Sequence, residues 1–167
     1  MSEEFVIARV FDAPRDLVWK VWTEPERLKH WWGPKGFKII SCTVDLRPGG
    51  MFHYGMHTPD GREMWGRFIY QEVVKSQRLV FIVSFSDEKR GVTRHPWNAD
   101  WPLDTLSTVR FEDEGSKTKV TVRWIPADSA TPFERKTFDE GRDGMQQGWT
   151  GTFDQFAGYL ANPPAKP

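Results

Sequence analysis

The spacing of hydrophobic positions changes along the chain, and each change predicts a different kind of element. Residues 5–11 are rich in β-branched and aromatic side chains and predict a first strand. In residues 14–22 and 25–32 the apolar positions recur at helical spacing, which predicts two short helices. Thr23 followed by Glu26 has the spacing of a capping box, so we expect it to begin the second of these helices.

From residue 37 the apolar positions recur every second residue, which is typical of half-buried antiparallel strands. In 37–46 the even positions from Ile40 to Leu46 are apolar, so these side chains are expected to face the core. The run 51–57 follows, with apolar side chains on one face and His53 and His57 on the other. Further strands are predicted at residues 64–74, 79–85, 106–112 and 117–125.

The C-terminal part predicts one long helix. Thr131-Pro132-Phe133-Glu134 is a helix start with a cap, a proline in the first turn and a glutamate at the third position. An apolar stripe continues it over residues 144–161, on Met145, Trp149, Phe153, Phe156 and Leu160.

Glycines on this helix are also three or four residues apart, at 144, 148 and 151. They indicate either that a sheet comes close to the helix or that the helix is frayed, and Gly141 and Gly144 are candidates for a kink. Strands and helices are segregated along the chain, so the predicted fold class is α+β, with a curved antiparallel sheet of about seven strands around the long C-terminal helix.

Residues 86–105 show neither period and hold two prolines and two tryptophans. Irregular segments of this length are often lids or binding loops. Trp97 and Trp101 are expected to fold back on the body or to meet a second subunit in a homodimer, where tryptophan is enriched. An ordinary loop held by its tryptophans is the alternative.

Composition narrows the possible functions. The chain of 167 residues is most simply one domain, 1–167, with a core over about 5–161 and a loose tail at 162–167. The 23 basic residues balance the 23 acidic ones, which argues against nucleic acid as a partner. No apolar run reaches the ~18 residues of a membrane span, and the acidic N-terminus does not look like a signal peptide. A single Cys42 excludes an internal disulfide, so we expect a reducing, cytoplasmic setting.

Motifs for catalysis or metal binding are few. His53 and His57 would lie roughly 13 Å apart on one strand face, too far to share a metal, and neither a metal nor a cofactor is predicted. The sequence has no nucleophile elbow, phosphate loop or dinucleotide fingerprint. Asp45, Glu63, Arg67 and Arg123 could give a cavity a polar end or could be solvated charges on the sheet, so catalytic turnover stays open.

Four segments resemble one family of proteins, those similar to the activator of the heat-shock protein 90 ATPase, within the START-like or SRPBCC (Bet v 1-like) superfamily. These segments are FDAPRDLVWKVWTEPERLKHWWGP, DLRPGGMFHYGMHTPDG, WPLDTLSTVRFED and GWTGTFDQFAGYLA, at residues 11–34, 45–61, 101–113 and 148–161. The resemblance implies a helix-grip fold whose cavity, between sheet and long helix, binds apolar molecules. Some members of the superfamily are cyclases or hydrolases. Chaperone activators that resemble this domain carry an additional N-terminal domain, which we do not find here.

The 9 tryptophans, 12 phenylalanines and 3 tyrosines fit either an aromatic-lined cavity or a densely filled core. We expect a cavity that binds a small apolar or aromatic molecule. The alternatives are a cyclase or hydrolase that uses the same cavity, or a stress-related protein that associates with a chaperone. The expected ligand-binding residues are Trp32, Phe52, Tyr54, Phe68, Phe81, Val83, Trp101, Val109, Phe111, Trp124, Met145, Trp149 and Phe153.

Overall fold

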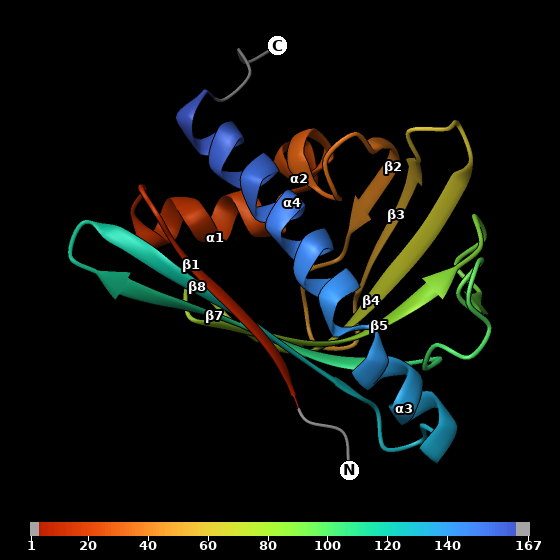
Figure 1. Cartoon of the computed structure of the whole chain (residues 1–167). Helices are drawn as coiled ribbons and strands as arrows, with labels where there is room; N and C mark the ends of the chain where they lie inside the picture. Colours follow the sequence, from red (N-terminus) through yellow and green to blue (C-terminus); the bar gives the residue numbers. More distant parts are fainter. Residues whose placement is uncertain (1–3, 163–167) are drawn as a thin grey trace.

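The computed structural model describes residues 4–162 and confirms the predicted succession of strands and helices (Figure 1). In chain order the elements are β1 (Phe5–Phe11), α1 (Arg15–Thr23), α2 (Pro25–Trp31), β2 (Lys38–Val44), β3 (Met51–His57), β4 (Glu63–Val74), β5 (Arg78–Ser86), β6 (Val92–Thr93), β7 (Thr105–Glu114), β8 (Lys117–Pro126), α3 (Pro132–Glu140) and α4 (Arg142–Ala161). The strands pair antiparallel in the order β1-β8-β7-β5-β4-β3-β2, and the short β6 pairs with β5. Only β6 has no counterpart among the predicted strands.

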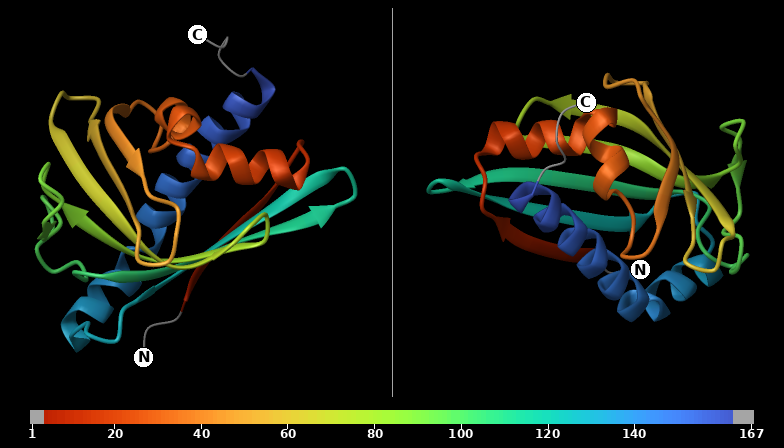
Figure 2. Two further views of the ribbon diagram at one scale, coloured as in Figure 1. Left: turned by 180° about the vertical axis from the view of Figure 1, so that it is seen from behind. Right: turned by 90° about the horizontal axis from the view of Figure 1, so that it is seen from above.

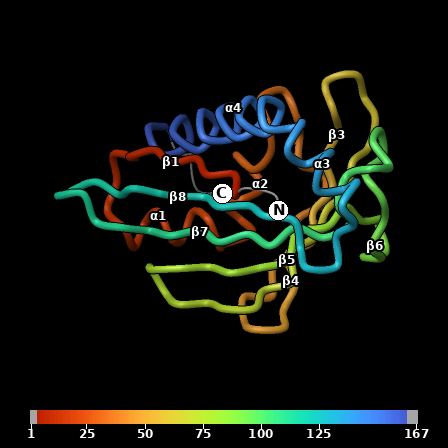
Figure 3. The backbone as a smooth tube through the Cα atoms, turned by 60° about the horizontal axis from the view of Figure 1, so that its bottom comes forward, coloured from red at the N-terminus to blue at the C-terminus, as the bar shows by residue number. Residues whose placement is uncertain are grey.

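The sheet curves, and α4 crosses its concave side (Figures 1 and 2). Helices α1 and α2 lie on the same side and contact each other, and α2 also contacts α4. Seen from below, the β7–β8 hairpin extends beneath α1, and α3 lies at the opposite end (Figure 3). The arrangement confirms the predicted α+β class, with a sheet wrapped around a long C-terminal helix.

Aromatic side chains fill the concave space at the end near α1 and α2. Trp22 stacks on Trp149 with ring centroids 6.1 Å apart, and Phe156 lies 4.6 Å from Trp31. From β1, Phe11 meets Phe156 edge-on at 4.7 Å. The helical spacing of apolar residues on α1 accounts for this packing, because it places Trp22 on the buried face of the helix. This end of the molecule is therefore a filled core.

The predicted long C-terminal helix is two helices that meet at Gly141. Thr131 and Glu134 form the predicted capping box, in which each side chain accepts a hydrogen bond from the other residue's backbone N–H. Helix α3 ends at Gly141, which is both its C-cap and the N-cap of α4. The predicted kink is thus confirmed at Gly141, while Gly144 lies inside α4.

The capping box predicted for α2 is wrong. Thr23 is still the last residue of α1, where its hydroxyl donates to the carbonyl of Trp19 at 2.8 Å. The N-cap of α2 is Glu24, whose side chain makes no capping hydrogen bond, and Pro25 begins the helix. A buried Thr23 committed to the preceding turn is not available as a cap.

The simple alternation predicted for β2 is also wrong at its start. A bulge in the β2–β3 pairing lies between Ile39 and Ser41. It turns Ile39 toward the core and leaves Ile40 41% exposed. Beyond the bulge Cys42 and Val44 pack against the core as the alternation predicts.

At the C-terminus, Asn162 is the C-cap of α4, and the rest of the predicted loose tail lies outside the described residues. Within residues 4–162, none of the helices combines the length and the apolar character needed to cross a membrane.

Candidate ligand-binding site

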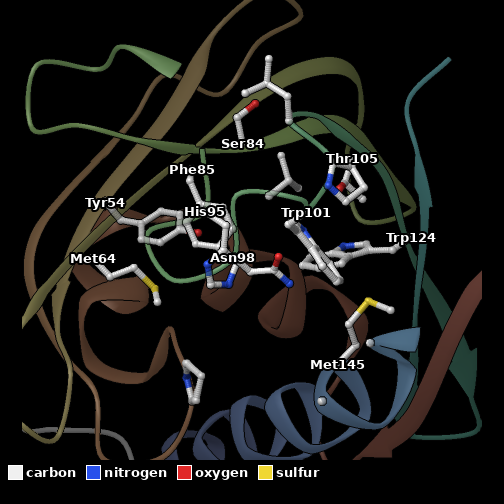
Figure 4. A pocket seen from close by; sticks show the side chains of 16 residues that line it. Tyr54, Met64, Ser84, Phe85, His95, Asn98, Trp101, Thr105, Trp124 and Met145 are labelled. Atoms are coloured by element: carbon white, nitrogen blue, oxygen red, sulfur yellow. The ribbon is translucent and has the colours of Figure 1, made fainter. Parts of the chain in front are cut away.

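The concave space is not filled at its other end. A cavity of about 470 Å³ lies between the sheet, the first turns of α4 and the segment 95–105 (Figure 4). A second cavity of about 170 Å³ adjoins it toward the aromatic core, beside Trp32, Phe68 and Trp149. The residues that line both are Pro34, Tyr54, Val83, Trp124 and Met145. The larger volume falls within the ~300–1,000 Å³ of ordinary ligand pockets.

On the sheet side, Tyr54 lies flat across the neighbouring strand. Its partner in the β3–β4 register is Gly66, and a Cβ atom added there would lie 2.4 Å from the hydroxyl oxygen of Tyr54. The missing side chain at Gly66 is what gives the phenol room. Burial raises the pKa of Tyr54 to about 12, opposed in part by the indole of Trp32, so the hydroxyl keeps its proton at neutral pH.

On the helix side, two glycines open onto the cavities. A Cβ added at Gly144 or Gly148 would meet no atom within 4 Å, and these residues line the larger and the smaller cavity respectively. The predicted close approach of a sheet is therefore wrong for both. At Gly151 a Cβ would lie 3.3 Å from the backbone nitrogen of Lys35, so there the α2–β2 segment approaches the helix.

The third wall is the segment between β6 and β7, which folds back onto α3 as expected for Trp101. The Trp101 ring lies 5.5 Å from Phe138 and covers Gly141, where an added Cβ would come within 2.7 Å of the indole. The Arg94 guanidinium pairs with Glu134 in the first turn of α3. These contacts hold the segment across the mouth of the larger cavity.

Two further contacts fix the ends of this wall. Ser84 donates to the carboxylate of Asp104 at 2.6 Å, which joins β5 to the residue before β7. Trp97 does not reach the cavity and remains 45% exposed, with the Arg62 guanidinium 4.2 Å above its ring. The homodimer that the two tryptophans suggested would have to rest on Trp97, because Trp101 is committed to α3.

His95 and Asn98 bring polar groups to the cavity from this segment. Nδ1 of His95 accepts the backbone N–H of Trp97 at 3.0 Å, and the ring lies 4.5 Å from Phe85. Oδ1 of Asn98 accepts the backbone N–H of Asp100 at 3.2 Å. Burial lowers the pKa of His95, so its neutral form dominates at neutral pH.

Two indoles in the walls lack partners. Among the described residues, Nε1 of Trp124 is buried without a hydrogen bond, and Nε1 of Trp32 is buried beside the Tyr54 hydroxyl without reaching hydrogen-bond geometry. The ring of Trp124 meets that of Trp149 edge-on at 5.7 Å, and that of Trp32 meets Tyr54 edge-on at 5.6 Å. A buried N–H without a partner is uncommon in folded proteins. Trp124 lines both cavities and Trp32 lines the smaller one, but the two nitrogens are covered by neighbouring atoms.

The structure brings most of the expected ligand-binding residues to the cavities. Those that line one or both are Trp32, Tyr54, Phe68, Val83, Trp101, Trp124, Met145 and Trp149. The others are packed within the filled core: Phe52, Phe81, Val109, Phe111 and Phe153. They share the concave side, but α1, α2 and neighbouring rings occupy the space in front of them, as Trp19 does for Phe111 at 5.4 Å.

Sequence reasoning missed the small and polar part of the lining. It did not select Ser84, His95, Asn98 or Thr105, nor the aromatic Phe85, and it singled out Gly144 and Gly148 for a different role. The irregular segment 86–105 was the available signal, because long loops commonly contribute to binding sites. Which of its side chains turn inward depends on contacts with α3, which are distant in sequence.

The charges proposed as a polar end lie elsewhere. Asp45 pairs with Arg47, Arg123 pairs with Glu4, and Glu63 accepts the indole N–H of Trp65.

Arg67 donates to the carbonyl of Arg90. Its register partner His53 is buried, and Nε2 of its ring lies at hydrogen-bond distance, 3.0 Å, from the carbonyl oxygen of Asp87. Along β3 and β4 both residues alternate with Phe52 and Phe68 of the core, so they face the outer side of the sheet. Within residues 4–162, no group of three His, Cys, Asp or Glu side chains is placed to hold a metal ion.

The fold recurs in solved structures of bacterial proteins. A Nitrosomonas europaea protein is 29% identical, with 95% of this chain and 94% of that chain covered and a TM-score of 0.74. A Mycobacterium smegmatis protein is 23% identical, with 97% and 93% covered and a TM-score of 0.77. A Silicibacter pomeroyi protein described as AHSA1 is 17% identical, with 95% and 98% covered and a TM-score of 0.71. None of the curated proteins matches the chain significantly.

A family model gives the more specific result. The model described as Activator of Hsp90 ATPase homolog 1-like protein matches residues 12–161, from the residue after β1 to the last residue of α4. The match includes α1, α2, the whole cavity lining and both C-terminal helices. The chain therefore belongs to the Activator of Hsp90 ATPase homolog 1-like family.

Proposed function

We propose that this protein binds a small apolar or aromatic molecule in the cavity between the sheet and α4. The observation that carries the proposal is the pair of adjoining cavities, about 470 Å³ and 170 Å³, in a molecule whose concave side is otherwise densely filled by aromatic rings. An open space lined by Trp, Tyr, Phe and Met side chains contributes binding free energy through buried apolar area, at ~25 cal/mol per Å² before the costs of association.

The same geometry favours binding over acid–base catalysis. Among the described residues that line the two cavities, none carries a carboxylate. Nδ1 of His95 is engaged by the backbone N–H of Trp97, so the lone pair that a general base needs is already used. A cyclase or hydrolase would require a proton acceptor that this lining does not supply. A flat pH–rate profile, or no turnover on aromatic polyketide-like substrates, would weigh against the enzyme.

The test is a cavity-filling substitution with a matched control on the same helix. Gly148→Leu places an isobutyl group into the smaller cavity, whereas Gly158→Leu adds the same group at an exposed position; a Cβ at either glycine meets no atom within 4 Å. We expect flavone to quench the tryptophan fluorescence of the wild type saturably and to raise its melting temperature. Gly148→Leu should weaken this binding about fivefold or more, since overpacking costs ~1–3 kcal/mol. Gly158→Leu should bind as the wild type does.

Two results would contradict the proposal. If flavone, a fatty acid and a sterol all fail to bind the wild-type protein, the cavity does not serve apolar ligands. If Gly148→Leu binds as tightly as Gly158→Leu while both variants remain folded, the ligand lies elsewhere. A circular dichroism spectrum and a melting curve for each variant establish that it is folded.

The family description favours a second candidate, which is association with an Hsp90-type chaperone. Such an association would use the outer surface of the molecule and would give the cavity no role. The assay is ATP hydrolysis by the purified chaperone with and without this protein. A concentration-dependent increase would support this candidate, and an unchanged rate would leave ligand binding as the function to pursue.

A further inference from the structure

Two polar side chains of the segment 95–105 line the cavity, and in both the acceptor atom is used by the backbone whereas the donor is not. The Nδ1 atom of His95 accepts the N–H of Trp97, so the neutral ring carries its proton on Nε2. Oδ1 of Asn98 accepts the N–H of Asp100, which leaves the amide NH₂ as the donor. Figure 4 shows both side chains between Tyr54 and Trp124.

The indole N–H groups of Trp32 and Trp124 do not add to these donors, because both nitrogens are covered by neighbouring atoms and that of Trp32 lies beside the Tyr54 hydroxyl. Trp32 is itself only 8% exposed. The donors offered to the cavity by the segment 95–105 are therefore Nε2 of His95 and the amide of Asn98, beside the aromatic surfaces described above. A ligand oxygen that reaches these two side chains would supply the acceptor that the protein does not provide for them.

Charge defines the ligand further. Among the described residues that line the two cavities there is neither a lysine nor an arginine. Arg94, the cation nearest in sequence to His95, pairs with Glu134. Burial lowers the pKa of His95, so the imidazole is uncharged at pH 7.5. A carboxylate or phenolate bound among these residues would give up part of its hydration without meeting a counter-charge, which is costly, although Asn98 itself is exposed.

We propose that the ligand is a neutral aromatic carbonyl compound, a ketone or quinone, whose oxygen accepts hydrogen bonds from His95 Nε2 and Asn98 Nδ2. This inference rests on the proposed function and specifies its ligand class. The flat body of the molecule occupies the space between Tyr54, Trp124 and Met145, and the carbonyl faces the segment 95–105.

Three tricyclic probes of nearly equal size test the proposal. 9-Fluorenone has an acceptor carbonyl, fluorene has no polar group, and carbazole has an N–H donor instead. We measure each dissociation constant by quenching of tryptophan fluorescence at pH 7.5. The expected result is fluorenone binding about fivefold to tenfold tighter than fluorene, as one or two neutral hydrogen bonds imply, and carbazole binding no tighter than fluorene.

Variants locate the preference in the two proposed donors. Asn98→Asp keeps the oxygen that accepts the Asp100 N–H and replaces the donor NH₂ by an acceptor, so fluorenone should lose its advantage and carbazole should gain. His95→Phe removes the second donor, and His57→Phe is its control, because His57 is exposed and outside the cavity. The carbonyl stretch of bound fluorenone should shift to lower wavenumber in the wild type and in His57→Phe, and less in His95→Phe.

The outcomes separate the two proposals. Equal affinity for the three probes, or a preference for carbazole, would overturn the carbonyl inference and leave a cavity that binds aromatic molecules. An unshifted carbonyl stretch in the wild type would do the same. If none of the probes binds, both the inference and the proposed function fail. A preference for fluorenone that survives both Asn98→Asp and His95→Phe in folded protein would remove these side chains from the site.

Discussion

At the scale of single residues, two neighbouring isoleucines of β2 have opposite roles. The bulge in the β2–β3 register turns Ile39 toward the core and leaves Ile40 41% exposed. A bulge inserts one residue without a partner, so the faces of the strand are exchanged on either side of it. Burial in this strand therefore follows the pairing with β3 and not the spacing of apolar residues alone.

Paired substitutions test this assignment. We expect Ile39→Ser to lower the free energy of unfolding by about 1–2 kcal/mol, because a partly buried side chain leaves the core. Ile40→Ser should change it by less than ~0.5 kcal/mol, as surface substitutions usually do. Urea denaturation of the two variants beside the wild type gives both values. If Ile40→Ser lowered the free energy of unfolding more than Ile39→Ser does, Ile40 would be the core residue, as simple alternation predicts, and the bulge would be contradicted.

The residues that the sequence could not place share one property, which is dependence on a distant partner. His53 follows the predicted alternation, yet it is only 3% exposed because the Asp87 carbonyl and the ring of Trp65 cover it. Gly144 and Gly148 were selected correctly by their spacing, but for the wrong reason. No atom approaches them, and they leave room for the cavity.

At the scale of elements, two similar sequence signals had opposite outcomes. Thr131 with Glu134 forms a capping box, whereas Thr23 with Glu26 does not. In the first case a proline follows the cap directly and ends any preceding helix. In the second, Thr23 is held in the last turn of α1 by the carbonyl of Trp19. The existence of each helix could be predicted from the local pattern. Its boundary could not, because Thr23 can bond either to the turn before it or to the turn after it, and the sequence does not say which.

Glu134 makes the start of α3 sensitive to pH. Its pKa is lowered by the hydrogen bond from the Thr131 backbone N–H and by the Arg94 guanidinium. Because the folded state favours the carboxylate, the stability it contributes is present above the unfolded pKa of about 4.3 and is lost as pH falls through the folded value.

We therefore expect Glu134→Gln to be less stable than the wild type at pH 7 by about 0.5–1 kcal/mol, because glutamine can keep the capping hydrogen bond but loses the charge that interacts with Arg94 and the helix N-terminus. The difference should shrink as the pH falls below about 4, measured by urea denaturation at each pH. Lys136→Gln, on the exposed side of the same helix, serves as the control for a change of charge. A wild-type advantage that stays constant down to pH 2 would show that the Glu134 carboxylate does not stabilise α3.

At the scale of the whole molecule, the same aromatic side chains either fill the concave space or line a cavity. At one end α1 and α2 bring Trp19, Trp22 and Trp31 against the sheet and α4, and the space is closed. At the other end there is only an irregular segment, and the space stays open. The sequence predicted which side chains lie on the concave side of the sheet. It could not predict which of them fill the core and which line the cavity, because that depends on where α1 and α2 pack. Sequence reasoning accordingly selected most of the large side chains of the cavity and, apart from Tyr54, none of its side chains with a hydroxyl, amide or imidazole group.

The open end of the concave space is bordered by the segment 95–105, which contacts the helices through the Trp101 ring on Gly141 and through the neighbouring Arg94–Glu134 pair. Gly141 has ordinary negative φ, at −89°, so its backbone accepts alanine without strain and only the indole stands in the way. We expect Gly141→Ala to displace Trp101, to accelerate amide hydrogen exchange in residues 92–104 and to weaken flavone binding. Gly158→Ala meets no atom within 4 Å, and should instead stabilise α4 by up to ~1 kcal/mol with unchanged exchange and binding. If both variants are stabilised alike and exchange at 92–104 is unaffected, the segment is held by other contacts, such as the Arg94–Glu134 pair, and Trp101 is not its anchor. If exchange accelerates at residues 92–104 while the amide exchange rates of the β-sheet stay unchanged, the contact between Trp101 and Gly141 is what holds the segment over the cavity.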